Sequence, residues 1–213
     1  MSKTCIKFCG LKKIDDLVYA DSLDIDLLGL IFTPKSPRFI TKDILREIVS
    51  LKITKPLVGV FMDQSVEYVN EVNSILRFDY LQFHGSESYD YCNSFNTPFI
   101  KTIHIGSEQI ITDKMLIKSA SMILFDTQIS NNKGGTGIRF DWSRLTNDQF
   151  LQEIIETKKY LVAGGLNLDN INDLLLTYKP MGLDVSSGIE RDIGEKNHEK
   201  MQHFVNIVRT YDS

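Results

Sequence analysis

Short apolar runs recur along this chain, and more polar stretches separate them. Each run is four to six residues long and rich in leucine, isoleucine, valine and phenylalanine, which is typical of parallel strands buried on both faces. We predict β-strands at residues 5–8, 27–32, 57–62, 80–83, 99–104, 122–125, 160–163 and 182–185.

Several of the stretches between these runs have apolar residues at helical spacing. The pattern predicts helices at residues 41–51, 65–76, 167–178 and 196–211. Thr41 is a helix-capping residue type at the start of the first of these stretches. The helical pattern is weakest at residues 107–118 and in the segment after Asp141.

Eight strands, each followed by a helical stretch, predict a single (β/α)8 TIM barrel over residues 1–213. The alternative is a doubly wound open sheet. That fold favours a Gly-x-Gly-x-x-Gly turn after its first strand, whereas this chain has Cys9-Gly10-Leu11 there. The barrel is therefore the better interpretation.

The charge and cysteine content narrow the partners and the compartment. The formal net charge of -4 argues against nucleic acid or a membrane surface as the main partner. The three cysteines have irregular spacing, which indicates free thiols in a reducing compartment. No apolar run is long enough to span a membrane, and the N-terminus has no signal-peptide core. We expect a cytoplasmic protein, either monomer or homodimer.

The turns after the last two predicted strands are suited to binding a phosphate. Small residues there leave backbone N–H groups open to an anion. Barrels commonly bind phosphate at this place, at the start of a short extra helix. A third glycine-rich segment follows the sixth strand. The candidate phosphate-binding residues are Gly134, Gly135, Thr136, Gly137, Gly164, Gly165, Ser186, Ser187 and Gly188.

Strand alternation places Lys7 and Cys9 on one face of the first strand and Ile6 and Phe8 on the other. With the apolar pair facing the helices, Cys9 lies inward at the carboxyl end of the strand, where barrel active sites form. A nearby ammonium lowers a thiol pKa, so we expect Lys7 to favour a thiolate at Cys9. The alternative is a buried, inert cysteine.

Two charged residues follow the sixth and second strands. Asp126 comes at the end of an apolar run, where a carboxyl group can act as an acid or base, or can cap the next turn. Facing Cys9 across a small barrel, it could stay protonated and donate. Arg38 ends a segment that two prolines stiffen, and its guanidinium suits a carboxylate. A solvated surface arginine is the alternative.

Further polar residues alternate inward on the fourth and eighth strands. Gln82 and His84 share one face, and Asp184 and Ser186 share another. Each can line the pocket or simply fill the barrel interior. We predict no metal site, because the other histidines, among them His104, are scattered along the chain.

These residues occur in short motifs that together resemble the phosphoribosylanthranilate isomerase family. The motifs run in order from Ile6 to near the C-terminus: Lys7-Phe8-Cys9-Gly10-Leu11, Pro34-Lys35-Ser36-Pro37-Arg38, Val58-Gly59-Val60-Phe61, Leu81-Gln82-Phe83-His84-Gly85, Phe125-Asp126-Thr127, Gly134-Gly135-Thr136-Gly137 with Phe140-Asp141-Trp142, Ala163-Gly164-Gly165-Leu166, and Asp184-Val185-Ser186-Ser187-Gly188-Ile189-Glu190. Phe8 and Phe83 depart from the family's usual residues, and we expect both to face away from the pocket.

The resemblance implies an Amadori rearrangement of a phosphorylated small molecule, N-(5'-phosphoribosyl)anthranilate, with no cofactor. It implies Cys9 as general base, Asp126 as general acid, and Arg38 as a ligand for the anthranilate end. Lys7, Gln82, His84 and Asp184 would then be further substrate-binding residues.

Two other functions remain open at this point. A related phosphosugar isomerase of the histidine pathway would use an aspartate where this chain has Cys9, which argues against it. A barrel that binds a phosphorylated ligand without catalysis is the other alternative.

Overall fold

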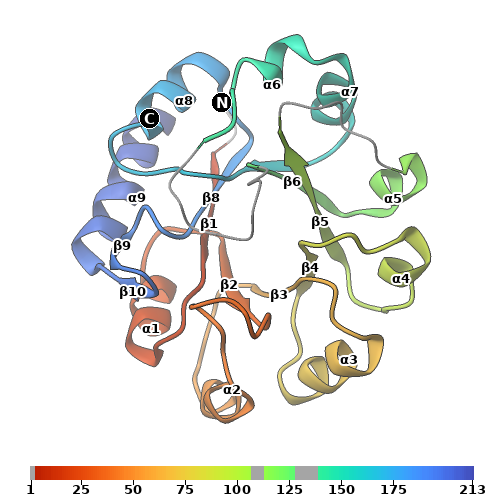
Figure 1. The fold of residues 1–213 in the computed structure, drawn as a ribbon. Helices are drawn as coiled ribbons and strands as arrows, with labels where there is room; N and C mark the ends of the chain where they lie inside the picture. Colours follow the sequence, from red (N-terminus) through yellow and green to blue (C-terminus); the bar gives the residue numbers. More distant parts are fainter. Residues whose placement is uncertain (1–2, 107–112, 128–138) are drawn as a thin grey trace.

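Eight parallel strands form a closed barrel with helices around its outside (Figure 1). This computed structural model describes residues 3–106, 113–127 and 139–213. The barrel strands are β1 (Cys5–Cys9), β2 (Leu27–Ile31), β3 (Leu57–Phe61), β4 (Tyr80–Phe83), β5 (Phe99–Ile105), β6 (Met122–Thr127), β7 (Tyr160–Val162) and β8 (Gly182–Val185). Each strand pairs with the next, and β8 closes the barrel by pairing with β1. The predicted (β/α)8 architecture is confirmed.

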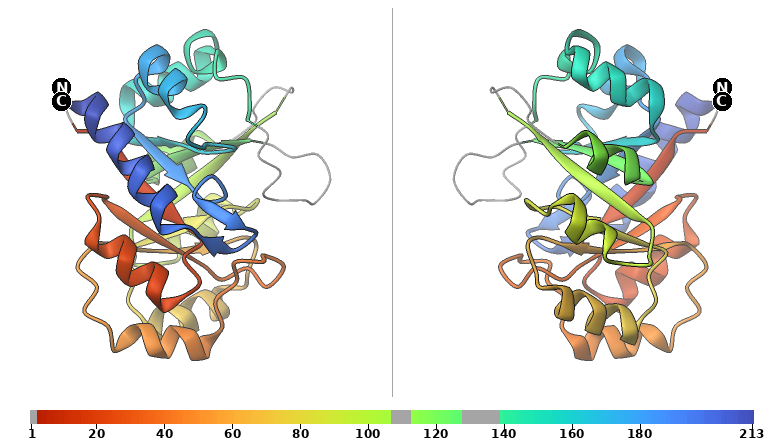
Figure 2. Two further views of the ribbon diagram at one scale, coloured as in Figure 1. Left: turned by 90° about the vertical axis from the view of Figure 1, so that its left-hand side faces the viewer. Right: turned by 90° about the vertical axis from the view of Figure 1, so that its right-hand side faces the viewer.

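The helices lie along the outer face of the sheet (Figure 2). They are α1 (Ile14–Ser22), α2 (Lys42–Val49), α3 (Val66–Ile75), α4 (Tyr89–Asn93), α5 (Lys114–Ser119), α6 (Arg144–Asn147), α7 (Gln149–Thr157), α8 (Ile171–Tyr178) and α9 (His198–Asp212). Thr41 caps α2 as predicted, because its side chain accepts a hydrogen bond from the N–H of Ile44.

Two apolar cores follow from the alternation of side chains along the strands. On β1, Ile6 and Phe8 are fully buried in the core between sheet and helices, whereas Cys9 belongs to the core inside the barrel. Phe83 packs outward against the rings of Tyr91 and Phe95. The predicted inward and outward faces are therefore confirmed at these positions.

The segment after β8 differs from the expectation. Barrels commonly have a short extra helix here, whereas this chain forms an antiparallel hairpin of β9 (Glu190–Asp192) and β10 (Glu195–Lys196). The following helix consequently begins at His198, two residues later than predicted. Glu190 forms buried ion pairs with Arg38 and Lys196, and these hold the hairpin at the rim of the barrel.

Candidate functional site

A buried ion pair lies inside the barrel between β1 and β8. Nζ of Lys7 is 2.9 Å from Oδ1 of Asp184, and the two residues are partners in the strand register. Burial alone would lower the pKa of Lys7, but Asp184 and Cys9 outweigh that effect, and the pKa is raised. Lys7 therefore remains a cation next to Cys9.

Cys9 lies above this pair at the carboxyl end of β1, opposite Gly29 of β2. A Cβ at Gly29 would lie 2.8 Å from Sγ of Cys9 and 3.1 Å from Nζ of Lys7, so only glycine leaves room for both groups. Burial raises the pKa of the Cys9 thiol, and Lys7 offsets only part of that rise. The sequence prediction identified the right neighbour but was wrong about the net direction of the pKa shift, because it could not include the loss of solvent.

Asp126 lies on the inner side of β6 near its carboxyl end and faces His84. Nε2 of His84 is 3.2 Å from Oδ2 of Asp126, and Oδ1 accepts a 2.7 Å hydrogen bond from the N–H of Thr127. Burial alone would raise the pKa of Asp126, but the hydrogen bond and charge of His84 outweigh it, and the pKa is lowered. The sequence left the protonation state of Asp126 open, and the lowered pKa favours its carboxylate form in the free protein.

Two neighbours hold the other edge of the His84 ring. Nδ1 lies 3.0 Å from Oγ1 of Thr102 and 3.2 Å from Nε2 of Gln82. Gln82 is almost fully buried, and its Oε1 has no hydrogen-bond partner among the residues that the structure describes. Gln82 thus orients His84 from inside the barrel.

His104, which we did not predict as a site residue, also lies beside His84. Its Nε2 is 2.8 Å from the carbonyl oxygen of His84, and the two rings meet edge to face. Burial lowers the pKa of His104, which keeps the ring neutral. The histidines are scattered along the sequence, but the register of β5 with β6 pairs His104 with Asp126 and so brings His104 to this group.

Arg38 is held by a carboxylate of the protein itself. Its Nε and Nη2 donate to the two oxygens of Glu190 at 2.7 and 2.6 Å, and Nζ of Lys196 lies 2.8 Å from Oε1. Burial opposes ionisation, but Arg38 and Lys196 hold the pKa of Glu190 below its ordinary value. Nη1 of Arg38 makes no hydrogen bond to the described residues. The solvated alternative is thereby excluded, because Arg38 is buried.

The two predicted phosphate turns lie side by side. Gly164 and Gly165 have φ angles of +82° and +68°, which favour glycine. Asn167 forms a β-bridge with Gly188. A Cβ added at Gly188 would lie 1.9 Å from the carbonyl oxygen of Leu166, so only glycine fits there. The bridge brings these two turns together, whereas Gly134, Gly135, Thr136 and Gly137 lie outside the described residues.

The β9–β10 hairpin adds a cation that sequence reasoning missed. Nζ of Lys196 lies 2.9 Å from the carbonyl oxygen of Ser186 and 3.4 Å from its hydroxyl. A Cβ at Gly10, whose φ is +73°, would lie 2.5 Å from Cδ of Arg38 and 3.0 Å from Oγ of Ser186. Three segments therefore meet at one place on the rim: the turn after β1, the turn after β8 and the segment that ends at Arg38.

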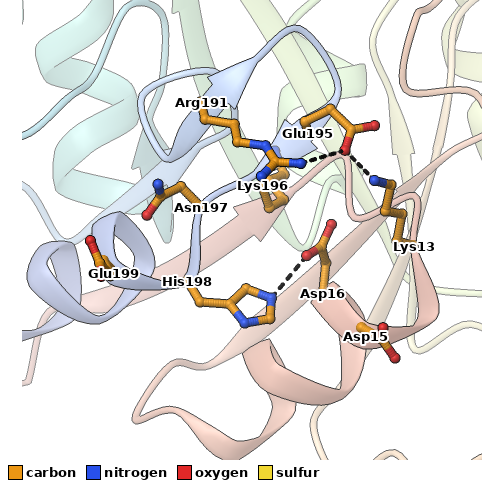
Figure 3. Close-up of a pocket in the computed structure, with 9 residues that line it drawn as sticks. All are labelled: Lys13, Asp15, Asp16, Arg191, Glu195, Lys196, Asn197, His198 and Glu199. Atoms are coloured by element: carbon orange, nitrogen blue, oxygen red, sulfur yellow. Dashed lines mark hydrogen bonds and ion pairs between the residues drawn. The ribbon is translucent and has the colours of Figure 1, made fainter.

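A separate hollow of about 470 Å³ lies behind this rim, between the starts of α1 and α9 and the hairpin (Figure 3). Its charged groups mostly pair with one another: Asp16 with His198, and Lys13 with Glu195. Of the residues around Arg38, only Lys196 also lines this hollow. The hollow therefore lies apart from Cys9 and Asp126, which do not line it.

The fold and these residues define a (β/α)8 barrel with titratable side chains and two small-residue turns at its carboxyl rim, which is the architecture of barrel enzymes. In the part of the chain that the structure describes, no helix is long and apolar enough to cross a membrane. Comparison with known proteins shows to which family within this class the chain belongs.

Residues 6–207 match the family model described as N-(5'phosphoribosyl)anthranilate (PRA) isomerase. A Stenotrophomonas maltophilia protein named N-(5'-phosphoribosyl)anthranilate isomerase is 37% identical over 99% of this chain and 95% of its own. The chain therefore belongs to the N-(5'-phosphoribosyl)anthranilate isomerase family.

Solved structures agree with this assignment. The Thermus thermophilus phosphoribosyl anthranilate isomerase superposes with a TM-score of 0.81 at 25% identity, over 97% of this chain and 99% of the other. A second structure, with a TM-score of 0.77 and 26% identity over the same shares of the two chains, is a phosphoribosyl anthranilate isomerase in complex with reduced 1-(o-carboxyphenylamino)-1-deoxyribulose 5-phosphate.

Proposed function

We propose that this chain catalyses the Amadori rearrangement of N-(5'-phosphoribosyl)anthranilate to 1-(2-carboxyphenylamino)-1-deoxyribulose 5-phosphate, a step of tryptophan biosynthesis. The observation that carries the proposal is the placement of Cys9 and Asp126. Both face inward near the carboxyl ends of their strands, and β1 and β6 are three strands apart around the closed barrel. A substrate between them would meet one group on each side.

Asp126 would supply the proton that opens the ribose ring. Protonation of the ring oxygen breaks its bond to C1 and leaves a cationic imine. Because the pKa of Asp126 is lowered, the proton has to be shared with His84, whose Nε2 lies 3.2 Å away. His84 is thus a proton-holding partner in this proposal, in addition to its predicted place beside the substrate.

Cys9 would then remove the proton from C2 of the opened sugar. The electrons of the C–H bond flow into the cationic imine and form an enolamine, which tautomerises to the ketone. The imine is the electron sink, so the reaction needs no cofactor. The thiol of Cys9 must first lose its own proton to solvent, and Lys7 stabilises the thiolate that remains; the raised pKa makes this thiolate a stronger base.

The two ends of the substrate would be held by different parts of the rim. Nη1 of Arg38 is the donor available to the anthranilate carboxylate, because Glu190 engages Nε and Nη2. Gly164, Gly165, Ser186, Ser187 and Gly188, with the Gly134 to Gly137 loop including Thr136, would bind the phosphate through backbone N–H groups. Asp184 would act indirectly, by holding the ammonium group of Lys7 in its ion pair.

We further propose that residues 1–213 act as one barrel domain in the cytoplasm, as a monomer or homodimer. The absence of a membrane-spanning helix among the described residues is compatible with this location. The free thiols of Cys5, Cys9 and Cys92 are compatible with a reducing compartment.

The fluorescence of the anthranilate adduct provides the test. Purified protein mixed with N-(5'-phosphoribosyl)anthranilate should abolish the adduct fluorescence with multiple turnovers, and Asp126→Asn should slow this by about 10²-fold or more. Folded wild-type protein that leaves the fluorescence unchanged would favour a barrel that only binds its ligand.

A further inference from the structure

His84, His104 and Asp126 form a group whose chemistry differs from that of an acid–base pair alone. One nitrogen of each ring and one carboxylate oxygen all lie within 4.8 Å of one another. His84 directly follows β4, His104 belongs to β5 and Asp126 to β6, so three consecutive strands bring the group together. We propose that this group binds a divalent transition-metal ion such as Zn²⁺, and that the bound ion inhibits the enzyme.

The spacing of the first two ligands already matches a metal site. Nε2 of His84 is 3.2 Å from Oδ2 of Asp126. Two ligands at about 2.0–2.1 Å from a tetrahedral Zn²⁺ are about 3.3 Å apart. With every ligand atom of the group within 4.8 Å of the others, His104 has to approach by at most about 1.5 Å.

Both histidines have a polar neighbour at the ring nitrogen that a metal-binding histidine turns away from the ion. Such rings donate their second N–H to a carbonyl or hydroxyl oxygen, which fixes the tautomer and leaves a lone pair for the metal. Nε2 of His104 donates to the carbonyl oxygen of His84 at 2.8 Å. Nδ1 of His84 lies 3.0 Å from the hydroxyl of Thr102 and 3.2 Å from Nε2 of Gln82, so metal binding through Nε2 requires the tautomer in which Nδ1 donates to Thr102. The rings are therefore oriented before any ion arrives.

The surroundings allow a cation to enter. The side chains of His84 and Asp126 are 24% and 22% exposed, so the group opens to solvent at the rim. Lys101, whose charge acts on His104, is paired with Glu87 at 2.8 Å and also donates to the carbonyl oxygen of Gly85. This pairing offsets part of its charge, although Lys101 still contributes to the lowered pKa of His104.

The ligand set selects the kind of ion. Two imidazoles and one carboxylate suit Zn²⁺, Ni²⁺ or Cu²⁺, whereas Mg²⁺ and Ca²⁺ prefer oxygen ligands. An ion on Oδ2 of Asp126 would replace the proton shared with His84. The predicted inhibition therefore rests on the proposed role of Asp126, whereas the predicted binding does not.

Calorimetric titration of the folded protein with ZnCl₂ tests the binding. We expect one ion per chain in the wild type and at least about tenfold weaker binding in His104→Gln and in Asp126→Asn. His203→Gln is the matched control, because His203 is an exposed histidine on α9 and should bind as the wild type does. Equal affinity in wild type and both ligand variants, or no binding to the wild type, would overturn the proposal. Circular dichroism spectra establish that each variant is folded.

The thiols need their own control, because thiolates also bind Zn²⁺. The same titration of Cys9→Ala should retain the site. If Cys9→Ala loses the ion while His104→Gln keeps it, the site belongs to the thiol and the proposal is wrong.

The inhibition is measured separately. ZnCl₂ should suppress the loss of adduct fluorescence in the wild type, and a chelator should restore it. Binding without inhibition would contradict the role given to Asp126 and leave the metal site standing. Inhibition of equal strength in His104→Gln would contradict the site.

Discussion

Arg38 and Glu190 form a buried, two-pronged ion pair, with Nε on Oε1 at 2.7 Å and Nη2 on Oε2 at 2.6 Å. The loop after β2 and the hairpin after β8 are joined through these atoms. The pair also decides which edge of the guanidinium is left for a substrate.

Glu190→Gln should destabilise the protein and weaken substrate binding together. The substitution leaves Arg38 and Lys196 buried without a counter-charge, and removing one partner of a buried pair typically costs about 3–5 kcal/mol. Denaturant unfolding measures the loss, and steady-state kinetics should show a raised KM. Glu153→Gln on the exposed face of α7 is the control and should change stability by less than about 0.5 kcal/mol.

The same ion pair predicts that the unfolding free energy of the protein falls at acid pH. Arg38 and Lys196 hold the pKa of Glu190 below its ordinary value of 4.5 in the folded protein. A lowered folded pKa means that the carboxylate contributes fully above 4.5 and loses its contribution as pH falls through the folded value. The difference in unfolding free energy between wild type and Glu190→Gln should therefore shrink below pH 4.5. A difference that stays constant down to pH 2.5 would show that Glu190 is not stabilised as an anion.

Arg38→Ala should act mainly on affinity. Loss of the guanidinium removes the donor proposed for the anthranilate carboxylate, so KM should rise while kcat changes little. Kinetics must be run well below the unfolding temperature, because Glu190 loses its partner in this variant. An unchanged KM with a reduced kcat would rule out the carboxylate contact.

The sequence was sufficient for the barrel and for part of the site. Alternation along β1 placed Lys7 and Cys9 inward and Phe8 outward, because a strand buried on both faces still has two distinct sides. Asp126 and the turns at Gly164 and Gly188 followed from their positions at strand ends.

The remaining features depend on packing between distant segments. His104 reaches Asp126 only through the register of β5 with β6, which no local pattern encodes. Glu190 and Lys196 form a hairpin where a helix start was expected. The raised pKa of Cys9 depends on burial by the closed barrel, so the sequence pair Lys7 and Cys9 alone predicted the opposite direction.

Gly164→Ala should reduce kcat more than an alanine substitution at another glycine with the same backbone strain. Its Cβ would lie 2.1 Å from Oγ1 of Thr127 and 2.8 Å from Oδ1 of Asp126, which displaces the proposed acid. Gly194→Ala is the matched control, since its φ of +80° is almost the same as the +82° of Gly164, while its nearest neighbour, the carbonyl oxygen of Pro37, is 3.2 Å away. Backbone strain should cost each variant about 1–2 kcal/mol of stability, and Gly164→Ala should lose more because of its overlap with Thr127. Equal kcat values in the two variants would contradict the arrangement around Asp126.

The central claim is that the thiol on the inner face of β1 removes the C2 proton. Its most direct test is the kcat of Cys9→Ala, measured by the loss of adduct fluorescence beside Cys5→Ala, which removes a thiol from the same strand and the same interior core but at its opposite end. Cys9→Ala should lower kcat by about 10²-fold or more while Cys5→Ala stays close to wild type. A folded Cys9→Ala protein that turns over within about threefold of wild type would contradict this mechanism.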